Sequence, residues 1–111
     1  MARWYSRNKF GAIKQEYKGE KYDSKLEMRY AQQLDLMKKA KEIKGWRRQE
    51  KIRMEINGKL ICTYKIDFII EHNNGTEEYV ETKGYETAVW RLKWKLFDAL
   101  YPDIKKTIVK R

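Results

Sequence analysis

Two short turn sequences divide the middle of this chain into three segments, and they constrain its fold more than any other feature. Asn57-Gly58 is the strongest short signal for a β-hairpin, and residues 51–56 before it alternate apolar and charged side chains. A second turn is predicted at Asn73-Asn74-Gly75. The sequence therefore predicts a meander of three strands, over residues 51–56, 60–70 and 78–83.

An amphipathic helix is predicted on each side of this meander. Upstream, Ser24 to Glu27 has the S-x-x-E form of a capping box, and Gly45 is a plausible end of the helix. Its apolar stripe contains Leu26, Tyr30, Leu34 and Met37. Residues 87–100 form the second predicted helix, which stops before Pro102, and residues 104–109 form a last strand. The predicted inner side of the second helix contains Val89, Leu92, Leu96, Ala99 and Leu100.

The predicted order of elements is helix, three strands, helix and strand, which indicates one α/β (α+β) domain. A chain of 111 residues has room for a single core of this kind. Residues 1–22 show no sustained period and mix basic with aromatic side chains, so we predict a basic N-terminal arm there and a folded domain over 23–111. The arm would contact nucleic acid, or its aromatic residues would pack on the domain.

The charge balance favours nucleic acid as a partner. Lys and Arg number 26 against 16 Asp and Glu, which gives a net charge of +10, and 14% of the residues are aromatic. The alternative is a basic domain with a solvated surface. No apolar run approaches the ~20 residues of a membrane span, and the N-terminus has no apolar signal-peptide core. The single cysteine, Cys62, excludes an internal disulfide and agrees with a cytoplasmic location.

Basic and acidic residues are segregated along the chain. Residues 38–53 contain eight basic and two acidic side chains, whereas residues 66–81 contain five acidic side chains and no lysine or arginine. A metal site within a DNA-binding surface needs both regions, because the basic face attracts phosphate and the carboxylates hold the cation that bridges to it.

The acidic region carries a pattern that can cleave phosphodiesters. Asp67 is followed 14 positions later by Glu81-Thr82-Lys83, in which one residue separates Glu81 from Lys83, so that both point to the same face of a strand. Carboxylates at this point can hold Mg²⁺, and the lysine can orient or activate a water against a phosphate. A salt bridge between Asp67 and Lys83 is the structural alternative. It would not explain Glu81 beside them, since clustered like charges repel without a cation.

These motifs and their order resemble the PD-(D/E)xK nuclease superfamily over roughly residues 22–109, although Ile66 stands where the motif can have a proline. The wider context is also similar to a small phage-encoded family of unknown function. The segments that carry this similarity are Asp23–Glu27, Tyr64–Phe68, Glu81–Gly84 and Leu92–Phe97. The resemblance implies a restriction-endonuclease-like core of order α-β-β-β-α-β, with a mixed sheet flanked by helices.

The resemblance also implies roles for the site residues. Asp67 would be the central ligand of Mg²⁺, for which Mn²⁺ would substitute, with Glu81 as the second ligand and the backbone carbonyl of Thr82 as the third. Lys83 would position or deprotonate the attacking water and stabilise the charge that builds on the phosphate. Glu27 would complete the metal shell, or it would only serve as a helix cap.

Further residues are candidates for contacts with DNA. Those on the basic segment and on the second predicted helix are Arg47, Arg48, Gln49, Lys93 and Lys95. The tryptophans Trp46, Trp90 and Trp94 could stack on bases, although in a domain of this size packing in the core is favoured.

The sequence and the resemblance together predict a Mg²⁺-dependent DNA endonuclease. We expect it to be structure-selective, like a Holliday-junction resolvase, or nicking. A resolvase would act as a homodimer on branched DNA, in the host cytoplasm if the protein is phage-encoded. A non-catalytic nucleic-acid-binding protein on the same fold, and a nuclease subunit of a larger phage complex, are the alternatives.

Overall fold

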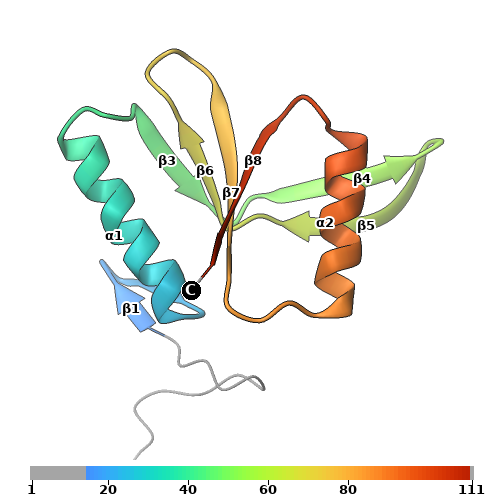
Figure 1. Ribbon diagram of the computed structural model, residues 1–111, viewed down its shortest axis with the longest axis horizontal. Helices are drawn as coiled ribbons and strands as arrows, with labels where there is room; N and C mark the ends of the chain where they lie inside the picture. Colours follow the sequence, from blue (N-terminus) through green and yellow to red (C-terminus); the bar gives the residue numbers. More distant parts are fainter. Residues whose placement is uncertain (1–14, 111) are drawn as a thin grey trace, which may run out of the picture.

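A four-stranded mixed sheet lies at the centre of the molecule in the computed structural model, which describes residues 15–110 (Figure 1). Its strands follow the order β3 (Gly45–Arg48), β6 (Phe68–Glu71), β7 (Glu77–Lys83) and β8 (Lys105–Lys110). β6 pairs antiparallel with both β3 and β7, and β8 runs parallel to β7. With its two helices the chain has the predicted α+β architecture.

The helices pack on opposite faces of this sheet. Phe68, Ile70 and Val80 lie in one core cluster with residues of α1 (Lys25–Lys39). Ile69 lies in a second cluster with residues of α2 (Ala88–Leu100). Because successive strand residues point to opposite faces, this division assigns one face to each helix. No helix within residues 15–110 is long and apolar enough to cross a membrane.

The hairpin of β4 (Lys51–Ile56) and β5 (Lys59–Lys65) is a separate two-stranded sheet that extends past α2 (Figure 1). Asn57 and Gly58 have φ values of 53° and 76°, which are the positive angles that a two-residue hairpin turn of the Asn-Gly type requires. The predicted turn is therefore confirmed, although the hairpin does not belong to the central sheet.

The prediction of the strands was wrong in two respects. Residues 51–56 are not the first strand of the central sheet. That strand is β3, whose first residue, Gly45, was predicted to end the first helix. The helix stops at Lys39 because Lys41 adopts a left-handed φ of 62°, and Gly45 begins β3 instead of ending the helix. The predicted strand 60–70 is two strands, interrupted at residues 66–67. With β4 and β5 as an inserted hairpin, the order α-β-β-β-α-β is retained.

The predicted inner side of α2 was right for Leu96 and Leu100, which pack on the second cluster, and wrong for Val89, Leu92 and Ala99, which are exposed. Val89 and Leu92 are 65% and 69% exposed, whereas Trp90 and Phe97 are buried in the core. Aromatic side chains bury more apolar area than Val or Leu, so the helix turns its aromatic stripe inward. Trp94 packs on the same cluster and Trp46 packs on the α1 cluster, which confirms that these tryptophans serve packing.

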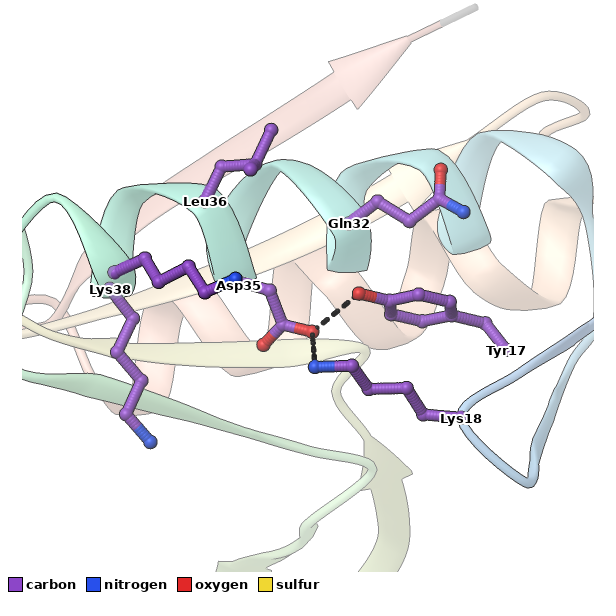
Figure 2. Close-up of a pocket in the computed structure, with 7 residues that line it drawn as sticks. Tyr17, Lys18, Gln32, Asp35, Leu36 and Lys38 are labelled. Carbon is purple, nitrogen blue, oxygen red and sulfur yellow. Dashed lines mark hydrogen bonds and ion pairs between the residues drawn. The ribbon is translucent and has the colours of Figure 1, made fainter.

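Part of the predicted N-terminal arm belongs to the folded domain. The strands β1 (Gln15–Tyr17) and β2 (Glu20–Tyr22) form a hairpin against α1, and Tyr22 is 2% exposed. Figure 2 shows the anchor of this hairpin: Asp35 accepts a hydrogen bond from the Tyr17 hydroxyl at 2.7 Å and pairs with Lys18 at 3.2 Å. The domain therefore begins before residue 23. Residues 1–14 of the predicted arm lie outside the described residues.

Candidate active site

The pairing of β6 with β7 brings two of the predicted site residues together. Phe68 lies opposite Val80 at the end of the antiparallel register, so Asp67 and Glu81 are the next residues along the chain on this side, and the charge of Asp67 acts on Glu81. Asp67 lies at the bend before β6, and its Oδ2 accepts hydrogen bonds from the backbone N–H and the hydroxyl of Thr82 at 2.9 and 2.8 Å. Thr82 thus orients the Asp67 carboxylate, a role that the sequence prediction missed.

Glu81 is held in an unfavourable place for a carboxylate. The residue is 4% exposed, and its Oε1 is buried with no hydrogen-bond partner within residues 15–110. Burial, followed by the negative charge of Asp67, raises the pKa of Glu81 to about 8, against the opposing effects of the Tyr64 hydroxyl and the Lys83 charge. Burial also raises the pKa of Asp67, although its hydrogen bonds from Thr82 lower it. Ionising both carboxylates is therefore costly unless a cation is present.

Lys83 completes this group from the same strand as Glu81. Its ammonium lies 3.7 Å from Glu81 Oε2 and 5.0 Å from the centre of the Trp90 ring. The Trp90 indole N–H donates to the hydroxyl of Tyr64 at 3.1 Å, which fixes the ring beneath the lysine. The lysine therefore pairs with Glu81, whereas the alternative considered from the sequence was a salt bridge with Asp67. Tyr64 and Trp90 are neighbours of Glu81 and Lys83 that the sequence prediction did not assign to the site.

Glu27 lies near the carboxylates, but protein groups hold both of its oxygens. Oε1 accepts from the backbone N–H of Asp23 at 3.1 Å, and Oε2 lies 3.4 Å from Arg48. Ser24 caps the helix by accepting from the Glu27 N–H at 3.1 Å. Burial raises the pKa of Glu27, and the charge of Asp67 contributes to the increase. The structure therefore supports the capping role and adds an ion pair with Arg48.

Asp67 and Glu81 could hold a Mg²⁺ only if other ligands, such as waters, complete its coordination. Within residues 15–110 no three His, Cys, Asp or Glu side chains lie close enough together to hold a metal ion. Asp67 and Glu81 form a pair, with an unpartnered oxygen on Glu81 and a raised pKa on both residues. Mg²⁺ is commonly bound by one or two carboxylates together with waters and substrate phosphates. The carboxylate pair fits this mode of binding, and it does not form a closed protein cage.

The two arginines predicted to contact DNA are engaged within the protein. Arg47 forms ion pairs with carboxylates on three sides, namely those of Glu50, Glu71 and Glu77. The Arg48 side chain is 11% exposed, and its guanidinium stacks 3.9 Å from the centre of the Tyr22 ring while it pairs with Glu20 and Glu27. Contact of either arginine with DNA stays a prediction. Apart from Glu50, their acidic partners come from other parts of the chain and are not visible in the basic segment itself.

The remaining predicted contact residues differ in their surroundings. Gln49 has a left-handed φ of 58°, and its backbone N–H donates to the carbonyl oxygen of Asp67 at 3.1 Å, so it lies at the rim of the site. Lys93 donates to the Thr63 carbonyl at 3.2 Å and is half-buried, whereas Lys95 is exposed on α2.

Comparison with known proteins identifies a family. The sequence profile of a family described as "Protein of unknown function (DUF1064)" matches residues 7–111, which is nearly the whole chain. No curated protein matches it.

Proposed function

We propose that the chain, which belongs to this family of unknown function, is a metal-dependent endonuclease that hydrolyses phosphodiester bonds in DNA. The observation that carries the proposal is the meeting of Asp67 and Glu81 across two strands, with Lys83 beside them and an oxygen of Glu81 left without a partner. A domain that only binds nucleic acid has no need of a buried carboxylate beside a second, half-buried one whose charge raises its pKa.

The chain's own residues would divide the chemistry as follows. Asp67, Glu81 and the backbone carbonyl of Thr82 would hold Mg²⁺, or Mn²⁺ in its place. The bound ion would lower the pKa of a water and neutralise charge on the phosphate. Thr82 holds Asp67 in a single orientation through two hydrogen bonds. Lys83, which donates hydrogen bonds and does not ligate cations, would orient the attacking water and stabilise the phosphate charge.

The arrangement of elements supports the resemblance to the PD-(D/E)xK nucleases. When β3, β6 and β7 are taken as the three core strands, Asp67 stands at the start of the second and Glu81-Thr82-Lys83 at the end of the third. The parallel strand β8 then follows α2 beside β7. This is the mixed sheet that a restriction-endonuclease-like core has, with the acidic pair at one end of its two inner strands.

For the substrate we propose branched DNA such as a four-way junction, with a nicked duplex as the second form to test. Contacts with the phosphate backbone read the position and shape of the duplex and carry no base sequence, and a basic surface favours such contacts. Coordinated cuts in a junction need two sites, and the exposed Val89 and Leu92 of α2 supply apolar surface for a second copy of the chain. If the gene is carried by a phage, the protein acts in the host cytoplasm.

The test is cleavage by the purified protein of supercoiled plasmid, linear duplex and a four-way junction, in Mg²⁺ and in EDTA. Asp67→Ala, Glu81→Ala and Lys83→Ala should each abolish cleavage while DNA binding persists. Asp103→Ala, which removes an exposed carboxylate before β8, is the matched control and should cut normally. Wild-type cleavage by all three site variants would refute the proposal.

A non-catalytic nucleic-acid-binding protein is the second candidate. The observation that favours it is Glu27, whose two oxygens are both held by protein groups and are not free for a metal. Titration of the protein with Mg²⁺ by calorimetry separates the two candidates. Binding heat that Asp67→Ala removes supports the nuclease. DNA binding in EDTA without any response to Mg²⁺ or Mn²⁺ supports the non-catalytic protein. DNA cleavage that occurs only when other phage proteins are present would indicate that the chain is a nuclease subunit of a larger phage complex.

A further inference from the structure

Two lysines stand directly opposite each other at the base of the β4–β5 hairpin. Lys51 and Lys65 are Cα partners in the antiparallel register, and both are exposed. Directly opposite residues have Cβ atoms about 4.5–5.5 Å apart, and like charges in this position destabilise the pair. Within residues 15–110 neither lysine has an ion-pair partner, so the structure leaves this repulsion unrelieved.

The two lysines lie on the face of the hairpin that α2 does not cover. Ile52, Met54 and Tyr64 belong to the cluster that packs with Trp90 and Phe97 of α2. Side chains alternate between the faces of a strand, so positions 51 and 65 are on the opposite face. The next pair on that face is Arg53 with Thr63. Among residues 15–110, the carboxylate that pairs with Arg53 is that of Glu55, further towards the turn.

The backbone pairing links this lysine pair to the carboxylate site. Beyond Lys51 and Lys65, the Ile66 N–H donates to the Glu50 carbonyl at 3.1 Å, and the Gln49 N–H donates to the Asp67 carbonyl at 3.1 Å. Lys65 therefore precedes Asp67 by two residues, which is at most about 6.6 Å along the chain. In Figure 1 the base of the hairpin meets the central sheet, while its tip lies beyond α2.

We propose that Lys51 and Lys65 form a phosphate clamp that holds the backbone of duplex nucleic acid next to the phosphodiester at Asp67 and Glu81. The identity of that neighbouring site rests on the proposed function. A phosphate between the two ammonium groups removes their repulsion, and duplex DNA supplies one negative charge per about 1.7 Å of its axis. The clamp would make the DNA contacts that the sequence predicted for Arg47 and Arg48. The guanidinium groups of these two arginines pair with carboxylates.

The experiment measures binding to a fluorescent duplex by anisotropy, over a series of salt concentrations and without divalent metal. Lys51→Gln with Lys65→Gln is compared with Lys38→Gln with Lys39→Gln, which removes the same charge from the far end of α1. The clamp variant should lower the slope of log K against log salt by about 0.9 per lysine, hence about 1.8 in total. The control should change the slope much less. Lys51→Arg with Lys65→Arg should restore the wild-type slope.

Two results would overturn the clamp. One is an equal change in slope for the clamp and control variants at unchanged melting temperature, because the contribution would then be general charge. The other is equal competition by a poly-glutamate peptide and by duplex of the same total charge, which would indicate an acidic protein partner.

The clamp and the nuclease can fail separately. If the clamp variant binds DNA more weakly but the wild-type protein cuts no DNA in Mg²⁺, the clamp proposal stands and the nuclease proposal fails. Cleavage by the wild type, together with a clamp variant that binds and cuts like the control, removes the clamp alone.

Discussion

The charge on Glu81 should destabilise the metal-free protein as pH rises, and removing it should reverse the effect. Burial and Asp67 raise the pKa of Glu81 from 4.5 to about 8. The folded state therefore binds the proton more tightly than the unfolded state. The stabilising contribution of protonated Glu81 is complete below pH 4.5 and is lost as the pH rises to about 8. At 1.36 kcal/mol per pKa unit, the full loss is on the order of 5 kcal/mol.

Glu81→Gln removes the titration but keeps a buried polar group. We therefore expect the metal-free variant to be more stable than the wild type at pH 8 by about 1–3 kcal/mol, which is less than the full electrostatic cost. At pH 4 the two proteins should have similar free energies of unfolding. Mg²⁺ should stabilise the wild type by mass action and leave Glu81→Gln unchanged.

The assay is urea unfolding at pH 4, 6 and 8 in EDTA and in Mg²⁺, with Glu42→Gln as the control for loss of an exposed carboxylate. A Glu81→Gln protein that follows the wild type at every pH would refute the reasoning. So would one that is less stable at pH 8. Either result would mean that the Glu81 carboxylate finds a favourable partner in the folded protein.

Three further outcomes are expected. In urea unfolding, Arg48→Ala should lower the free energy of unfolding by about 3–5 kcal/mol, because it leaves the buried Glu27 carboxylate without its cation. The control Lys44→Ala, on the surface, should have little effect. Asp35→Ala should cost about 1–3 kcal/mol in the same assay, since the Trp46 N–H and the Tyr17 hydroxyl lose their acceptor, while the rate of Mg²⁺-dependent cleavage is retained. Light scattering should give a dimer that Leu92→Glu converts to a monomer; a monomeric wild type would remove the dimeric form of the proposal.

The sequence by itself determined the features that depend on a few neighbouring residues. The Asn57-Gly58 turn, the Ser24 cap and the placement of Glu81 and Lys83 on one strand were all predicted, because each depends on backbone angles or hydrogen bonds within about four residues. The pairing of Asp67 with Glu81 followed from the prediction that two consecutive strands of the meander carry them.

Tertiary structure alone decided the features that depend on competition between distant groups. The short strand β3 has no alternating pattern, and it is a strand because β6 offers it a hydrogen-bonding edge. The buried face of α2 is the one whose side chains remove the most apolar area from water. Trp90 and Phe97 are therefore buried, and Val89 and Leu92 are exposed. Arg48 is structural because folding brings Glu27 and Tyr22 to it, and a pair formed over such distances in the chain leaves no local signal in the sequence.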